Sequence, residues 1–146
     1  MIRTCFVDSG ALVKRYVNEV GTGWVNALFA DASSRLYVAH VTGVEVVAAL
    51  ARRHPVRNVR IAIKAFQSDF ATGFAIIRMT DAVIDNAILL AQKYKLRGYD
   101  AVQLAAGVAV LTNSESEQVL FIASDVELLG AAKAEGFQIA NPNDYP

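Results

Sequence analysis

The sequence predicts an α/β protein in which a central, mostly parallel sheet carries helices on both faces. Five short runs of apolar and β-branched residues are each about as long as a strand that is buried on both sides. The longer segments between them have apolar residues three and four positions apart, which is the period of a helix. Strands and helices therefore alternate, and parallel strands need crossovers that are usually helical.

The five strands are expected at residues 4–7, 36–39, 74–77, 119–123 and 138–140. The helical patterns cover residues 10–16, 23–32, 43–53, 59–70, 82–94, 101–111 and 126–135. Thr42 can cap the third helix with Glu45 three residues later, Thr80 can start the fifth, and Gly136 can end the last. No segment of the 146 residues has the composition of a linker, so residues 1–146 are expected to form one domain.

Composition and charge exclude some classes of protein. Fourteen Lys and Arg balance 14 Asp and Glu, which argues against a protein that coats nucleic acid through an excess of positive charge. Cys5 is the single cysteine and lies in an apolar run, so we expect a buried thiol and a reducing compartment. That run, residues 2–7, is too short for a signal peptide, and no stretch reaches the ~18 apolar residues of a membrane span. These features predict a cytoplasmic protein.

Positive charge is concentrated in one stretch of the chain. Residues 52–64 contain five basic residues and no acid: Arg52, Arg53, Arg57, Arg60 and Lys64. The stretch is either a solvated helical hairpin or a surface that contacts phosphate or a partner protein, and the pattern leaves both interpretations open.

Four acids stand in apolar sequence instead of on a predicted exposed helix face: Asp8, Glu45, Asp100 and Asp125. Asp8 and Asp125 each follow a predicted strand, and open α/β sheets bind ligands at the carboxyl ends of their strands. Glu45 and Asp100 lie near the starts of two predicted helices, within reach of the same edge. Each acid also has a structural alternative: a helix cap for Asp8 and Asp125, a helix-dipole partner for Asp100, and a capping partner of Thr42 for Glu45.

Four carboxylates gathered in partly apolar surroundings need a cation, because burial and like charge both disfavour their ionised forms. Oxygen ligands without neighbouring His or Cys favour Mg²⁺ or Mn²⁺, and His40 and His54 have no partner at metal-ligand spacing. The chemistry that such a site supports is hydrolysis of a phosphodiester by a metal-activated water. The sequence has neither a dinucleotide-binding fingerprint nor a P-loop.

Three segments carry a resemblance to a known family: VDSGALVKRY at residues 7–16, LRGYDA at residues 96–101 and SDVEL at residues 124–128. Together with Glu45 in a helix of small and apolar residues, they resemble the PIN-domain ribonucleases, particularly the VapC-type toxins of prokaryotic toxin–antitoxin modules. The resemblance implies a three-layer α/β/α fold with a five-stranded sheet. It also implies a Mg²⁺- or Mn²⁺-dependent endoribonuclease that forms a homodimer and is inhibited by a cognate antitoxin inserted near the active site.

Carried over to this chain, the resemblance makes Asp8, Glu45, Asp100 and Asp125 the metal-binding and catalytic acids. Ser9 and Ser124 match hydroxyl residues beside the first and last of these acids, where each holds a metal-bound water or caps a helix; we favour the cap. The candidate contacts to RNA or antitoxin are Lys14, Arg52, Arg53, Arg57 and Arg60.

Other residues that could suggest chemistry have simpler interpretations. For Lys14 a solvated side chain is favoured over a contact to phosphate or antitoxin, and Trp24 and Phe29 are expected to pack against the helices instead of stacking on bases. The alternative function is a non-catalytic PIN-like module that binds RNA or protein. Four clustered acids argue against it, because concentrated negative charge beside phosphate weakens binding.

Overall fold

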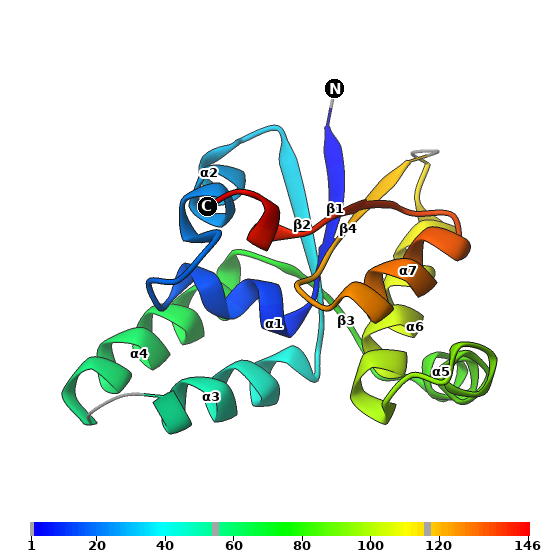
Figure 1. Cartoon of the computed structure of the whole chain (residues 1–146), viewed down its shortest axis with the longest axis horizontal. Coiled ribbons are helices and arrows are strands. Elements are labelled where there is room, and N and C mark those ends of the chain that lie inside the picture. Colours follow the sequence, from blue (N-terminus) through cyan, green and yellow to red (C-terminus); the bar gives the residue numbers. More distant parts are fainter. Residues whose placement is uncertain (1, 54–55, 116–117) are drawn as a thin grey trace.

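The computed structural model describes residues 2–53, 56–115 and 118–146, apart from the side chains of residues 56 and 57. Within these residues five strands form one sheet: β1 (Arg3–Val7), β2 (Ser34–Ala39), β3 (Ala75–Ile77), β4 (Val119–Ile122) and β5 (Gln138–Ala140). Their order is β3-β2-β1-β4-β5, and every neighbouring pair is parallel. The predicted five-stranded parallel sheet is confirmed (Figure 1).

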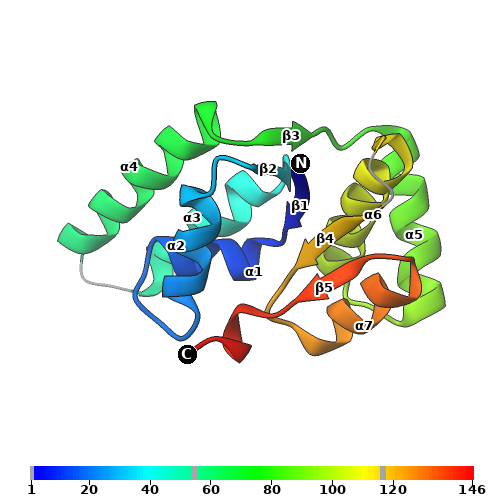
Figure 2. The same cartoon turned by 90° about the horizontal axis from the view of Figure 1, so that it is seen from above.

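Helices cover both faces of the sheet. One face carries α1 (Ser9–Leu12), the 3-10 helix η1 (Val13–Arg15), α2 (Thr22–Ala30), α3 (Thr42–Arg53) and α4 (Val56–Thr72). The other carries α5 (Asp81–Tyr94), α6 (Gly98–Asn113) and α7 (Val126–Ala134), and the 3-10 helix η2 (Pro142–Asp144) follows β5. Figure 2 shows these two groups on opposite sides of the strands. The three-layer α/β/α architecture is therefore confirmed.

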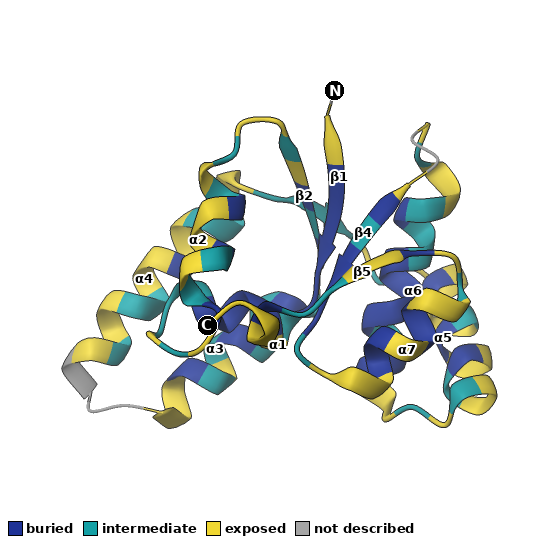
Figure 3. Cartoon of the chain, turned by 45° about the horizontal axis from the view of Figure 1, so that its top comes forward, coloured by how far each residue is buried: buried dark blue, intermediate teal, exposed yellow. Residues whose placement is uncertain are grey.

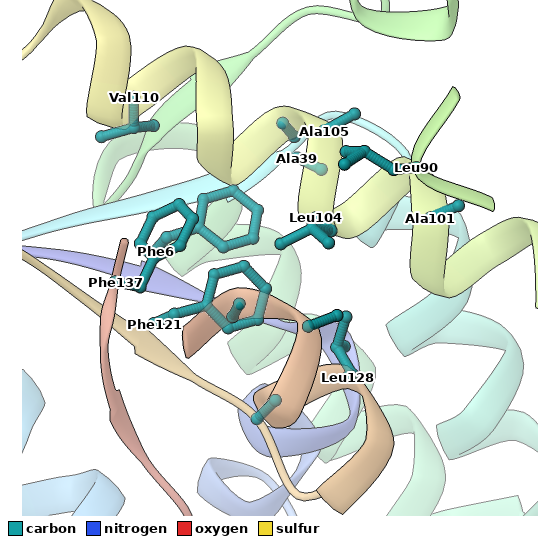
Figure 4. Close-up of a cluster of buried hydrophobic side chains, with 14 of the residues drawn as sticks. Phe6, Ala39, Leu90, Ala101, Leu104, Ala105, Val110, Phe121, Leu128 and Phe137 are labelled. Atoms are coloured by element: carbon teal, nitrogen blue, oxygen red, sulfur yellow. The ribbon is translucent and has the colours of Figure 1, made fainter. Parts of the chain in front are cut away.

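Strands β1 to β4 send alternate side chains into two cores. In β1, Cys5 and Val7 pack against the α1–α4 side, whereas Phe6 points to the α5–α7 side and stacks on Phe121 of β4 at a centroid distance of 5.1 Å (Figure 4). Because helices cover both faces, β3 and β4 are apolar throughout, and β1 and β2 are apolar after their first two residues. Burial keeps Cys5 fully inaccessible, as expected, and raises the pKa of its thiol to about 11.

The helix boundaries differ from prediction where tertiary contacts decide them. The helix expected at residues 10–16 divides into α1 and η1, and α4 extends beyond the expected residues 59–70. The interpretation of Thr42 as a cap is wrong: it is the first residue of α3, it is fully buried, and its hydroxyl accepts a hydrogen bond from Gln103. Thr80 does cap α5, and Gly136 leaves α7 with a φ of 104°. No helix in the described part is both long and apolar enough to cross a membrane.

Candidate active site

The topology brings two predicted strand ends together. The chain runs outward from β1 to β2 and β3 on one side and returns to β4 and β5 on the other, so β1 and β4 flank the switch point of the sheet. Val7 and Ile122 are partners at the carboxyl ends of these strands, and the Asp8 N–H donates to the Ile122 carbonyl. This is the place where open α/β sheets bind ligands.

A hollow of about 320 Å³ opens at this edge, and we call it the acidic hollow. It is lined by Asp8, Ser9, Gly10, Tyr99, Asp100, Ser124 and Asp125. The residues come from the ends of β1 and β4 and from the first turn of α6. Three of the four predicted acids therefore share one hollow.

Asp8 is almost fully buried, with 6% of its surface exposed. It caps α1, because its Oδ2 accepts a hydrogen bond of 3.1 Å from the Gly10 N–H. Burial raises the pKa of Asp8 to about 7; the Gly10 N–H opposes the rise, and the charges of Glu45 and Asp100 add to it. The cap uses only one carboxylate oxygen, so capping and a role in the hollow are compatible.

Asp100 and Asp125 both line the hollow but differ in exposure. Asp100 lies in the first turn of α6 with 8% of its surface exposed, and burial, followed by the charge of Asp125, raises its pKa to about 6. Asp125 is exposed and caps α7, since its Oδ1 accepts from the Leu128 N–H at 2.9 Å. The predicted cap and the predicted place at the strand end are thus both correct for Asp125.

Glu45 reaches the site from α3 and is half-buried. Ser9 Oγ donates to its Oε2 at 3.2 Å, and Gln103 Nε2 donates to its Oε1 at 2.7 Å. Its charge contributes to the raised pKa of both Asp8 and Asp100. The fourth acid is therefore coupled through charge to Asp8 and Asp100, and its hydrogen bonds come from Ser9 and Gln103.

The two serines do not act as the expected caps. Ser9 is the first residue of α1, its neighbour Asp8 makes the cap, and its hydroxyl holds Glu45 instead. At α7 the cap is Asp125, and Ser124 Oγ is buried without a hydrogen-bond partner among the described residues. The cap assignment is wrong for both residues because an aspartate side chain occupies each cap position.

A known protein family matches the part of the chain that contains the four acids. The family model described as PIN domain matches residues 5–129, which include all four acids. The chain belongs to the PIN-domain family. Ribonuclease VapC45 and Ribonuclease VapC49, from two strains of Mycobacterium tuberculosis, are each 34% identical to it over 110 residues, covering 72% of this chain and 75% of theirs.

A solved structure supports the fold of this PIN domain. A toxin-antitoxin complex from Klebsiella pneumoniae contains a chain that superposes with a TM-score of 0.61 at 20% identity. The match covers 94% of this chain and 97% of that chain. At such low identity the agreement concerns the path of the backbone.

Sequence reasoning missed three residues beside the acids of the PIN domain. Gln103 is fully buried and binds Glu45, and Tyr99 lines the acidic hollow with 52% of its surface exposed. Arg97 Nη1 donates to the Tyr99 hydroxyl at 2.8 Å, and its positive charge opposes the rise of the Asp100 pKa. A polar residue three positions after Asp100 in an apolar helix was the available signal for Gln103.

The basic candidates divide into two groups. Lys14 is buried and its ammonium pairs with Glu19 at 3.3 Å, so the expectation of a solvated lysine is wrong. Glu19 also pairs with Arg53, which ties the turn before α2 to the end of α3. Arg52 and Arg60 are exposed on α3 and α4, which lie side by side in Figure 1. The Arg57 side chain and His54 lie outside the described residues.

Trp24 and Phe29 of α2 pack within the protein as expected, although their ring partners lie outside the helices. Trp24 stacks on Tyr145 at 5.1 Å, and the Phe29 ring meets Phe74 edge-on at 5.5 Å. His40 is exposed and stacks on Phe70 at 6.4 Å.

The donor set of the acidic hollow fits a divalent cation that binds oxygen. Among the described residues, no three His, Cys, Asp or Glu side chains stand close enough together to hold an ion by themselves. Mg²⁺ does not need three protein side chains, because it commonly binds one or two carboxylates and keeps several waters. Burial and the neighbouring acids raise the pKa of Asp8 and Asp100, so a bound cation would favour their ionised forms. Ser124 Oγ is a buried oxygen without a partner in the described part of the chain.

Proposed function

We propose that this PIN domain is a Mg²⁺- or Mn²⁺-dependent endoribonuclease and the toxin of a toxin–antitoxin pair. The observation that carries the proposal is the gathering of Asp8, Asp100 and Asp125 in one hollow at the switch point of the sheet, with Glu45 hydrogen-bonded beside them. The names of the VapC ribonucleases support RNA as the substrate. The likeness to a chain of the Klebsiella toxin-antitoxin complex supports an antitoxin as the partner.

In this proposal the metal ion binds among Asp8, Glu45, Asp100 and Asp125, directly to one or two of these carboxylates and to the others through its bound waters. The bound ion would neutralise the acids, activate a water for attack on phosphorus and stabilise the charge that develops on the phosphate. The buried Asp8 and Asp100 supply the negative charge that attracts the ion, and Ser9 and Gln103 hold Glu45 in place. The exposed rim around Tyr99 and Arg97 leaves the hollow open to a polymer.

The proposal is tested by titrating Mn²⁺ while following the melting temperature and the cleavage of a mixed RNA pool. We expect Mn²⁺ to raise the melting temperature and to start cleavage, and Asp8→Asn to abolish cleavage. Asp85→Asn, on the exposed side of α5, is the control and should behave like the parent. If Mn²⁺ neither stabilises the parent nor allows cleavage, the chain is the non-catalytic module instead.

The toxin assignment has a separate test. A short reading frame directly upstream that encodes a DNA-binding protein with a tail would identify the antitoxin. Co-expression of the two should give a stable complex in which RNA cleavage is lost. The homodimer stays a prediction, which sedimentation of the purified chain can check.

A further inference from the structure

Gln103 is a long polar side chain in α6, which has more buried residues than any other helix in the described part of the chain. It lies in α6 between Ala101 and Ala106, and its exposed surface is 0%. Figure 3 shows α6 buried over much of its length. Burying an amide costs free energy unless hydrogen bonds replace those it made with water. An apolar residue would avoid this cost, so the contacts of the amide must account for its presence.

The amide nitrogen joins two points on α3. Gln103 Nε2 donates to Thr42 Oγ1 at 2.9 Å and to Glu45 Oε1 at 2.7 Å, which uses both of its N–H groups. An ionised carboxylate only accepts hydrogen bonds, so Glu45 fixes the orientation of the amide. The amide oxygen, Oε1, is buried without a partner among the described residues. The amide oxygen therefore lacks a hydrogen bond among the described residues, while the amide nitrogen binds α3.

Glu45 is held from two sides as a result. Ser9 Oγ of α1 donates to one carboxylate oxygen and Gln103 of α6 donates to the other. Gln103 stands three residues after Asp100, a spacing that places both on one face of α6. The charges of Asp8 and Asp100 repel Glu45, and its half-exposed side chain could otherwise turn toward solvent.

We infer that Gln103 is a positioning residue that holds the Glu45 carboxylate beside the acidic hollow. The acids of α3 and α6 then keep fixed positions relative to each other when a divalent cation binds. The inference rests on the proposed function. It concerns a residue that is fully buried and so does not touch RNA. Hydrogen-bond partners of metal-binding carboxylates typically contribute about 10–100-fold to metal affinity or activity.

The test compares Gln103→Met with Thr42→Val. The first removes the donor to Glu45 and keeps the length of the side chain; the second removes the other acceptor of the same amide and leaves Glu45 its donor. We expect Gln103→Met to weaken Mn²⁺ binding, measured by electron paramagnetic resonance, by about tenfold or more. Its kcat should fall at constant Mn²⁺ while the KM for RNA stays within about twofold. Thr42→Val should keep the Mn²⁺ affinity of the parent within about twofold.

Two results would overturn the positioning role. One is Mn²⁺ affinity within about twofold of the parent in Gln103→Met; the other is an equal loss in Thr42→Val, which would make the effect one of packing. If Gln103→Met does not fold, Gln103→Asn keeps an amide that is too short to bridge α6 and α3, and the same loss is expected. A parent that neither binds Mn²⁺ nor cleaves RNA would refute the proposed function itself, whereas an active parent with an unaffected Gln103→Met refutes only the inference.

Discussion

Asp8 performs two tasks with one carboxylate. Its Oδ2 caps α1 through the Gly10 N–H, while the side chain as a whole stands buried at the end of β1. A cap requires only one acceptor oxygen, so it does not compete with a second role at the hollow. The cost is electrostatic, because burial and the neighbouring Glu45 and Asp100 disfavour the charged form. At neutral pH the metal-free hollow therefore destabilises the fold.

The electrostatic cost of the buried Asp8 carboxylate predicts that, without metal, the effect of Asp8→Asn on the free energy of unfolding depends on pH. The pKa of Asp8 is about 7 in the folded chain against an ordinary 3.8, so between these values the folded state binds more protons and stability falls as pH rises. Asparagine still caps α1 but carries no charge. Urea unfolding in EDTA at pH 7.5 should show Asp8→Asn more stable than the parent by about 1–3 kcal/mol. Near pH 4 the difference should vanish.

Asp100→Asn should act in the same direction with a smaller gain, because the pKa of Asp100 is raised only to about 6. Asp85→Asn serves as the control and should leave the pH dependence unchanged. A loss of about 2 kcal/mol or more in either site variant at pH 7.5 would indicate a structural network of acids instead of a metal site.

At the level of elements, the start of α2 packs against the end of the chain. Gly21 has a φ of 89°, and a Cβ there would clash with the Pro142 carbonyl oxygen of η2. Next to it, the stacked rings of Trp24 and Tyr145 join α2 to the C-terminal residues. The close approach of the two backbones requires glycine, since any side chain would displace η2.

Gly21→Ala and Gly23→Ala form a matched pair that tests this contact. Gly21→Ala should lower the free energy of unfolding by about 2 kcal/mol or more, through the clash and the positive φ. Gly23 lies within α2, where an added Cβ meets nothing within 4 Å, so Gly23→Ala should raise stability by up to about 1 kcal/mol. The fluorescence of Trp24, the single tryptophan, should change in the first variant only. Equal stabilities in the two variants would show that η2 does not dock as described.

On the scale of the whole molecule, the net charge of zero is the sum of separated regions. The acidic hollow lies at the ends of β1 and β4, while the exposed Arg52 and Arg60 lie on α3 and α4. A cation in the hollow would remove most of the repulsion of RNA there. The exposed arginines could then contact phosphates without a general excess of positive charge.

Reversing Arg52 and Arg60 to Glu should weaken binding of RNA or antitoxin and reduce its dependence on salt. Each lost phosphate contact on a single strand makes the negative slope of log affinity against log salt less steep by about 0.7. Two lost contacts therefore make it less steep by about 1.4. The control reverses Arg35, near the amino end of β2, and Lys133, in the last turn of α7, which changes the net charge equally. An equal slope in the two double variants would exclude α3 and α4 as the binding surface.

Local sequence patterns predicted the place of those site residues that follow directly after a strand. Asp8 and Asp125 follow strand ends, and the period of apolar residues located those strands, so their meeting at one edge could be predicted from the parallel topology. Thr42, Lys14, Ser9 and Ser124 were assigned wrongly or incompletely. Thr42 and Ser9 bind residues that are 61 and 36 positions away, and an aspartate takes the cap beside Ser9 and Ser124. Lys14 pairs with Glu19, which is close in the sequence, but only the fold buries the lysine side chain.

By itself the sequence determined the α/β class, the number and order of strands along the chain and the four acids at the carboxyl edge, because hydrophobic period and strand length are local properties. Only the tertiary structure decided how those acids are held and charged. The burial that raises the pKa of Asp8 and Asp100 arises only when the helices pack against the sheet. The bonds from Ser9 and Gln103 to Glu45 join residues 36 and 58 positions apart, and such separations leave no periodic signal in the chain.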